Sequence, residues 1–393
     1  MLASSRYFLG RSLNRKLLIS STIHGCTSRL TPPMKKLSVL LLIQLPPPIH
    51  GAAIINERVN SILNNSEKIT NKAFKLNYAN NFKEMHAPLL WKIVYTATLV
   101  YRILIEYLNN RPQITYIAFS PFGLGFYRDL CFVGLAKLFA SKAYLHLHGT
   151  GLASTRSGIK SAMLKWMLRQ SKLILISPSL YQDISKFTKK SNVTIIENCV
   201  DDPGIHKRER QDCIKILYMA NLDERKGVKK AIEAFSELKG KGLNGRLVIA
   251  GADTAFLTRE SLQNYINDQY PEIKEDIQLF GPAYGNDKHN LFASSDIFLY
   301  PTQHDAAPLV VLEALSHGLP VVCSAQGALP DMIYHGENGF ISPSNSAKEY
   351  CSLLEASATD IDRLSISARN SYLEKYTPSS FRNKIEELFC AST

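Results

Sequence analysis

Two carboxylates eight positions apart, Asp305 and Glu313, lie on either side of a predicted helix start in the stretch from His304 to Gly339. Ala306-Ala307-Pro308 opens the helix, whose apolar sequence LVVLEALSHG ends at Gly318 before a buried strand. Amides at a helix N-terminus bind phosphate, and carboxylates accept hydrogen bonds from hydroxyl groups. The pattern therefore suits a ligand that carries both groups, such as a nucleotide-sugar. The alternative is an ordinary helix–strand unit whose carboxylates face water.

The same stretch resembles the donor-site signature of the retaining GT-B glycosyltransferases of family 4, also called glycosyl transferases group 1. The family pattern is Glu, seven residues, Glu-Ala, a small residue, Gly-x-Pro-Val-Val and a Gly-Gly turn. Asp305 stands in place of the first Glu, and Ala328 in place of the second Gly. The resemblance implies an α/β fold, GT-B, in which two Rossmann-like doubly wound domains face a cleft. The matching residues are Glu313-Ala314, Gly318, Pro320-Val321-Val322 and Gly327.

A second match lies at the segment Tyr218–Gly227, where the family pattern is Gly-Arg, four residues and Lys-Gly. Lys226-Gly227 match, whereas Ala220-Asn221 replace Gly-Arg. The resemblance implies that Lys226 acts in catalysis at the donor phosphates, in a donor site that includes Asn221. Asn221 replaces a phosphate-binding arginine of the family pattern. Arg225, beside Lys226, could supply that charge at the donor site, although its side chain is expected to point elsewhere. Lysine is disfavoured at a helix start by the macrodipole, which indicates a ligand there. The alternative is a solvated lysine.

The resemblance also implies roles for the carboxylates. Glu313 would accept hydrogen bonds from the ribose hydroxyls, and Asp305 would act in catalysis by binding hydroxyls of the donor sugar. The backbone between them would hold sugar hydroxyls or phosphate, although a proline has no N–H to donate. This donor-binding segment consists of Ala306, Ala307, Pro308 and Leu309.

Two features of the first half of the chain resemble family motifs. His148 ends the sequence LHLH before a glycine, as in the family's His-x-His-Gly, which implies a catalytic position beside the donor sugar. The alternative for His148 is a hydrogen-bonded core histidine. Gly51-Ala52 resembles the Gly-Gly loop over the donor phosphates.

Metal-binding patterns are missing from the predicted strand ends. The triplet Asp360-Ile361-Asp362 falls in a C-terminal helical pattern instead. We therefore expect metal-independent chemistry, no metal site, and no cofactor apart from the donor substrate. Lys226, the helix dipole and loop amides would stabilise the leaving nucleoside diphosphate.

Length and patterning predict two α/β domains and a terminal extension. The chain has 393 residues, of which 45% are hydrophobic and 20% charged. Apolar runs of strand length alternate with helical patterns, which favours parallel sheets. The predicted linker is the segment near 201–212. The predicted parts are an N-terminal extension at 1–33, disordered or outside the native start, an acceptor-side domain at 34–203, a nucleotide-sugar-binding domain at 204–376, and a C-terminal helix at 377–393 that returns to the first domain.

The net charge and the cysteine pattern restrict the classes of partner and the compartment that the sequence favours. The net charge of +12 suits nucleotide phosphates, polyanions or an anionic membrane face, and we find no nucleic-acid-binding motif. The seven cysteines form no C-x-x-C pair, which favours reduced thiols in the cytoplasm. The apolar stretch Pro88–Leu108 is either a core helix or a helix on the inner face of the cell membrane.

The sequence thus favours a retaining hexosyltransferase that acts on a glycolipid, lipopolysaccharide or polysaccharide acceptor in cell-surface glycan synthesis. Two other classes stay open: a catalytically weak GT-B scaffold, and a nucleotide-dependent oxidoreductase. Against the latter, the first strand–helix turn reads PPPIHGAA and lacks G-x-G-x-x-G. A GT-B sugar epimerase is a narrower alternative.

Overall fold

In the computed structural model, the described residues are 36–77, 88–156, 158–204 and 212–390. The chain divides into two units, Met1–Lys35 and Lys36–Thr393. The first unit lies outside the described residues, and so does the extension predicted at 1–33. Most of the linker predicted near 201–212 also lies outside them.

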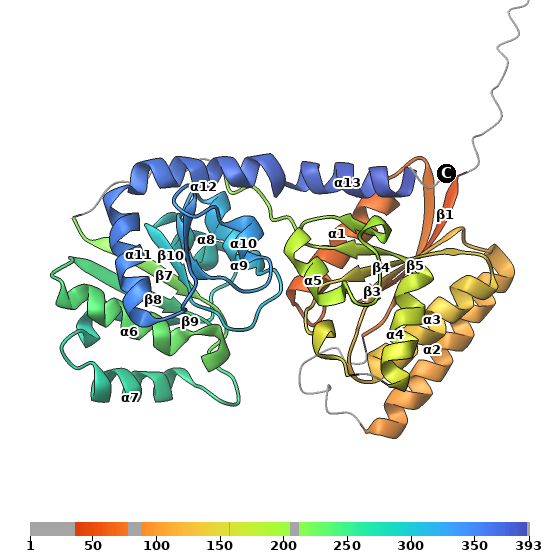
Figure 1. Cartoon of the computed structure of the whole chain (residues 1–393), viewed down its shortest axis with the longest axis horizontal. Helices are drawn as coiled ribbons and strands as arrows, with labels where there is room; N and C mark the ends of the chain where they lie inside the picture. The colour runs from red at the N-terminus through yellow and green to blue at the C-terminus, as the bar shows by residue number, and fades with distance from the viewer. Residues whose placement is uncertain (1–35, 78–87, 157, 205–211, 391–393) are drawn as a thin grey trace, which may run out of the picture. The chain divides into compact units, whose positions relative to one another are not determined.

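The first half of the second unit forms a six-stranded parallel sheet in the order β2-β1-β3-β4-β5-β6 (Figure 1). The strands are β1 Leu37–Ile43, β2 Ile69–Lys75, β3 Ile114–Phe119, β4 Lys142–Leu147, β5 Ser171–Leu175 and β6 Val193–Ile195. The helices between them are α1 Gly51–Asn64, α2 Leu89–Asn110, α3 Gly123–Leu138, α4 Ile159–Arg169 and α5 Tyr181–Ile184.

A second parallel sheet follows, in the order β12-β11-β10-β7-β8-β9. Its strands are β7 Ile214–Met219, β8 Gly245–Ala250, β9 Ile277–Gly281, β10 Ile297–Tyr300, β11 Val321–Ser324 and β12 Gly339–Ser342. Its helices are α6 Val228–Gly240, α7 Arg259–Gln269, α8 Gly285–Ala293, α9 Leu309–Ser316, α10 Leu329–Met332, α11 Ala347–Thr359, α12 Ile361–Lys375 and α13 Pro378–Cys390. The predicted α/β class with two Rossmann-like sheets is confirmed.

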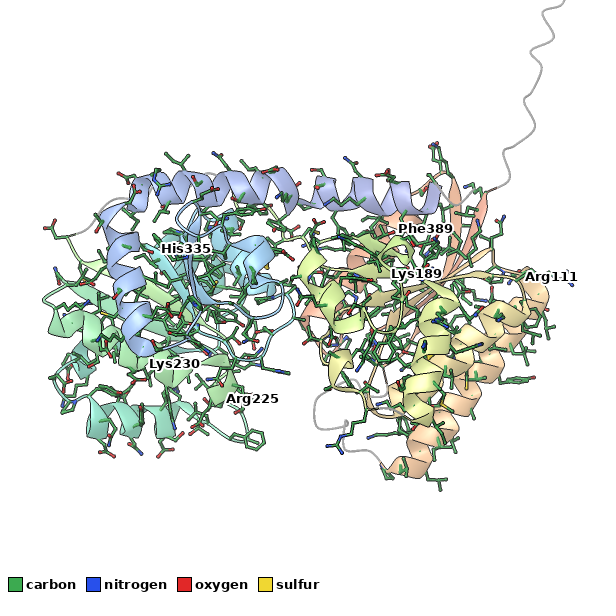
Figure 2. All side chains as sticks on the ribbon, viewed as in Figure 1. Arg111, Lys189, Arg225, Lys230, His335 and Phe389 are labelled. Carbon is green, nitrogen blue, oxygen red and sulfur yellow. The ribbon has the colours of Figure 1, made fainter. Side chains whose placement is uncertain are left out.

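Both faces of the first sheet are buried, which explains why its central strands read as continuous apolar runs. Leu40 and Leu42 of β1 pack in a core with side chains of α2, α3 and α4. Leu41 and Ile43 face the opposite core, which α1 and α13 cover. In the core under α1 and α13, the ring of Phe389, labelled in Figure 2, packs against the rings of Tyr116 of β3 and Tyr144 of β4.

Two strands, β2 and β12, do not read as apolar runs in the sequence, and both form sheet edges. β2 reads ITNKAFK and has only two buried residues, because one side of an edge strand has no neighbour. β12 has four residues, of which the two central ones are half-buried. Edge strands bury less apolar surface than central strands, so their hydrophobic signal is weak.

The apolar stretch at 88–108 forms α2, a helix of 22 residues. Leu99, Ile103 and Tyr107 pack in the core, whereas the opposite face of the helix carries exposed apolar side chains. Within the described part of the chain, neither α2 nor any other helix has the length and hydropathy needed to cross a bilayer.

Candidate functional site

A pocket of about 1020 Å³ lies at the carboxyl ends of the strands, where ligands bind in open α/β sheets. Segments that follow β1, β3 and β4 line it together with segments that follow β7, β8, β9 and β10. Eleven of the twelve residues predicted for the site line this pocket. They are Gly51, Ala52, His148, Asn221, Lys226, Asp305, Ala306, Ala307, Pro308, Leu309 and Glu313.

Arg225 is the predicted donor-site residue that does not line the pocket. Its guanidinium, labelled in Figure 2, pairs with Asp223 at 2.6 Å, and its side chain is 66% exposed. Arg225 and Lys226 belong to the 3₁₀ turn Glu224–Lys226, where successive side chains diverge. The structure therefore turns Lys226 toward the pocket and leaves Arg225 on the surface.

Lys226 and Asp305 form one ion pair of the pocket wall. The Lys226 Nζ lies 2.6 Å from Asp305 Oδ2 and 3.1 Å from the carbonyl oxygen of His304. The Tyr300 hydroxyl donates to the same carboxylate oxygen at 2.5 Å. Burial and the Asp305 charge raise the Tyr300 pKa well above its ordinary value, so its proton stays in place as a donor. Asp305 is thus held by a cation and a neutral hydroxyl.

Two glycines of the signature are needed for close backbone contacts around this pair. Gly227 has a φ of +83°, and a Cβ there would lie 2.2 Å from the Pro301 carbonyl oxygen. Gly327 has a φ of +56°, and a Cβ there would lie 2.3 Å from the Asp305 carbonyl oxygen. Side chains at either position would displace the backbone that carries Lys226 or Asp305.

Glu313 and Lys288 form the second ion pair of the wall. Lys288 of α8 donates to Glu313 Oε1 at 2.6 Å, and both residues line the pocket. Glu313 Oε2 is buried and accepts no hydrogen bond from any described residue. Burial raises the Glu313 pKa, and the nearby Lys288 opposes that rise. A buried acceptor without a partner is costly, which favours a ligand donor at Oε2.

Lys288 was absent from the predicted site. It matches no family motif, but it lies in the first turn of α8, whose N-terminus begins at Gly285. The signal that singled out Lys226 would have found it as well, because a lysine at a helix start opposes the macrodipole.

Four of the described α-helices begin at the pocket. Their N-caps all line it: His50 of α1, Phe122 of α3, Tyr284 of α8 and Pro308 of α9. The helix of the signature starts at Leu309, so the prediction that the amides of Ala306 and Ala307 begin it is wrong. The proline at 308 favours extended backbone at the residue before it, which places both alanines in the preceding loop. The helix N-termini contribute positive partial charge at the pocket, where both lysines are paired with carboxylates.

His148 lies across the pocket, directly after β4. The His146 and His148 rings are 4.0 Å apart between centroids, and the His146 Nδ1 hydrogen-bonds the Tyr116 hydroxyl. Burial, together with the nearby His50, lowers the His148 pKa to about 4. The His148 Nε2 has no hydrogen-bond partner among the described residues. A neutral imidazole with a vacant nitrogen can bind a substrate hydroxyl.

The lowered His148 pKa predicts a pH dependence of stability. Unfolding returns the pKa to about 6.5, so between pH 4 and 6.5 the unfolded chain binds more protons. The free energy of unfolding should therefore rise as the pH increases through this window. His148→Gln should flatten the rise by up to about 3 kcal/mol, as measured by urea unfolding at pH 4.5 and 7. An identical slope in both proteins would contradict a neutral His148.

Clusters that could hold a metal ion are not found in the described residues, since no three His, Cys, Asp or Glu side chains converge there. Metal-independent chemistry stays a prediction.

Comparison with known proteins adds independent evidence on the second sheet. Residues 205–364 match the family model described as Glycosyl transferases group 1. The amylovoran biosynthesis glycosyltransferase AmsK of Erwinia amylovora is 29% identical over 147 residues, which cover 36% of this chain and 35% of AmsK. The chain spans less than half the length of several curated relatives that it matches.

Solved structures match over most of the chain at low identity. The lipopolysaccharide outer core galactosyltransferase WaaB has a TM-score of 0.73 at 14% identity, with 91% of this chain and 100% of WaaB covered. HepE of Anabaena in complex with UDP-glucose has a TM-score of 0.64 at 14% identity, with 90% of this chain and 100% of HepE covered. The fold is therefore GT-B.

Proposed function

Because the chain has a GT-B fold and its residues 205–364 are a glycosyl transferases group 1 region, we propose that it is a glycosyltransferase. It moves a hexose-type sugar from a nucleoside diphosphate to a glycan or lipid-linked acceptor. The observation that carries the proposal is one pocket wall with two lysine–carboxylate pairs, Lys226–Asp305 and Lys288–Glu313.

The two pairs suit the two ends of a nucleotide-sugar. Glu313 has one carboxylate oxygen bound by Lys288 and one buried oxygen without a described partner, so it can accept from a ribose hydroxyl. The diphosphate would lie at Lys226 and at the α1 N-terminus, where Gly51 and Ala52 present amides outside the helical ladder. Asp305 would then accept from the donor sugar.

The proposed transfer retains the anomeric configuration. The bond from C1 of the sugar to the phosphate oxygen breaks while the acceptor oxygen bonds C1 on the same face. The acceptor proton passes to the departing phosphate oxygen. Negative charge grows on the diphosphate as the bond breaks, and Lys226 and the helix N-terminus stabilise it. His148 is neutral, so it positions a hydroxyl by hydrogen bonding and does not act as an acid.

Similarity to relatives supports a cell-surface acceptor. AmsK is named for amylovoran biosynthesis, and WaaB for transfer to the lipopolysaccharide outer core. We propose an acceptor of this class, a glycolipid or a polysaccharide, used from the cytoplasmic side. HepE binds UDP-glucose, which supports a nucleoside diphosphate hexose as the donor class.

A panel of UDP-, GDP- and ADP-sugars tests the proposal. One of them should raise the melting temperature, since a ligand that binds only the folded state stabilises it by mass action. The same sugar should be slowly hydrolysed in the absence of an acceptor. Binding without hydrolysis would favour the catalytically weak scaffold, which the replacements at Asn221 and Asp305 also suggest. A rise in the melting temperature with NADH but with none of the nucleotide-sugars would favour an oxidoreductase. Conversion of a nucleotide-sugar into its isomer would favour an epimerase.

Lys288→Met provides a test of the second ion pair. Without the cation, burial raises the Glu313 pKa further, so the carboxylate ionises only at higher pH. We expect KM for the donor to rise about tenfold at pH 7 with a small change in kcat. The loss should shrink as the pH increases, because the variant then recovers its carboxylate.

The matched control is Lys229→Met in α6, whose ammonium pairs with Glu224 away from the pocket lining. It should leave both constants unchanged. A pH-independent loss in Lys288→Met would contradict the coupling to Glu313.

A further inference from the structure

Helix α2 is apolar on two opposite faces. Leu99, Ile103 and Tyr107 are buried in the core of the first sheet. The other face carries a stripe at spacings of three and four residues, as the α-helix period requires for one face. The stripe consists of Leu90, Val94, Ala97, Tyr101, Ile105 and Leu108, and its large members have 73, 57, 63, 38 and 54% of their surface exposed. Such a continuous exposed stripe is unusual for a helix that faces only water.

The charges beside this stripe are positive. Arg102 lies next to it on the helix surface and stacks over the Phe74 ring at 5.5 Å. The acidic residue of α2, Glu106, has only 9% of its side chain exposed and pairs with Lys72. The exposed face of α2 thus carries apolar and basic groups without an exposed carboxylate of its own.

A pocket of about 270 Å³ lies between β2 and this flank of α2. Three cations line it, Lys72, Lys75 and Arg102, and no acidic side chain of the described residues does. The other lining groups include Phe74 and Tyr95. Because β2 is an edge strand, no other strand in the described ranges covers this side. The pocket therefore suits a phosphate group attached to an apolar body.

We propose that α2 and this pocket form a docking surface for a bilayer that contains anionic phospholipids. The apolar stripe enters the interface, and Lys72, Lys75 and Arg102 bind a headgroup phosphate. Aromatic residues on the same flank, with Trp91 stacked on Tyr95 at 5.5 Å, are typical of helices at the water–lipid boundary. A second copy of the chain is disfavoured, because a two-fold contact would bring the same cationic groups together.

The surface deepens the proposed function, since it would present a lipid-linked acceptor to the pocket at His148. Its test needs no sugar transfer. If the chain transfers sugar but does not bind vesicles, the docking surface is refuted and the enzymatic function is not. A chain that binds vesicles but fails with every nucleotide-sugar would refute the enzymatic function alone.

Co-sedimentation of the full chain with phosphatidylcholine vesicles, with and without phosphatidylglycerol, tests the surface. We expect binding to the anionic vesicles that weakens as the salt concentration rises. Tyr101→Asp and Arg102→Glu should each weaken that binding about tenfold. The basic residues of Met1–Lys36 are present in every variant, so they cannot produce the difference.

Matched controls are Ile366→Asp on α12, where the side chain is 64% exposed, and Lys348→Glu on α11. Both should bind vesicles as the unmodified chain does. Equal binding by all four variants, or equal binding to neutral vesicles, would overturn the proposal. So would a concentration-dependent dimer that Tyr101→Asp abolishes in sedimentation velocity, which would assign the face to a second copy. Unchanged melting temperatures confirm that the variants are folded.

Discussion

Lys226→Ala should lower kcat/KM for the nucleotide-sugar by about 10²–10³-fold, with most of the loss in kcat. The ammonium lies 2.6 Å from Asp305 at the pocket wall, where a departing diphosphate would accumulate charge. An interaction that strengthens as charge develops stabilises the transition state more than the bound substrate. Steady-state kinetics with varied donor and saturating acceptor separates the two constants.

A matched control is Lys229→Ala, which removes a lysine three residues away whose partner is Glu224. That variant should retain full activity. Lys226→Arg should recover part of the loss, because the charge returns with a different shape. A Lys226→Ala enzyme with the unmodified rate would contradict the assignment of the leaving-group site.

Glu313→Gln should weaken binding of the nucleoside diphosphate by about 10- to 100-fold, as expected for the loss of a hydrogen bond to a charged acceptor. The amide keeps the shape of the side chain but removes the charge that Lys288 neutralises. Calorimetric titration with the nucleoside diphosphate measures the loss directly.

A modified ligand makes this test specific. Removing the ribose 2′-hydroxyl should weaken binding to the unmodified chain, and the same removal should cost much less in Glu313→Gln, because the two groups would be partners. If both proteins discriminate equally between the ribose and deoxyribose ligands, Glu313 does not contact the pentose.

The central strands and their order of alternation with helices could be predicted from the sequence, because both faces of each sheet are buried and the runs are continuously apolar. β2 and β12 could not, since an edge strand leaves part of its surface to solvent. The two faces of α2 could not be separated either. Hydrophobic periodicity identifies one buried face, and here a second apolar stripe lies opposite to it.

The candidate site was predictable where local motifs carry it. Gly227 and Gly327 belong to turns whose backbone approaches other segments closely, so they leave a recognisable pattern. The ion pairs left no such pattern. Lys226 and Asp305 are 79 positions apart, and Lys288 and Glu313 are 25 apart, so only the folded sheet brings them together. The choice of Lys226 over Arg225 likewise depends on the direction of one 3₁₀ turn.

A crystal structure of the chain with a bound nucleoside diphosphate tests the central claim most directly. The account predicts a ribose hydroxyl at about 3 Å from a Glu313 carboxylate oxygen, with a phosphate oxygen at a similar distance from Lys226 Nζ. A nucleotide bound in another part of the molecule, with Glu313 still paired only to Lys288, would contradict it.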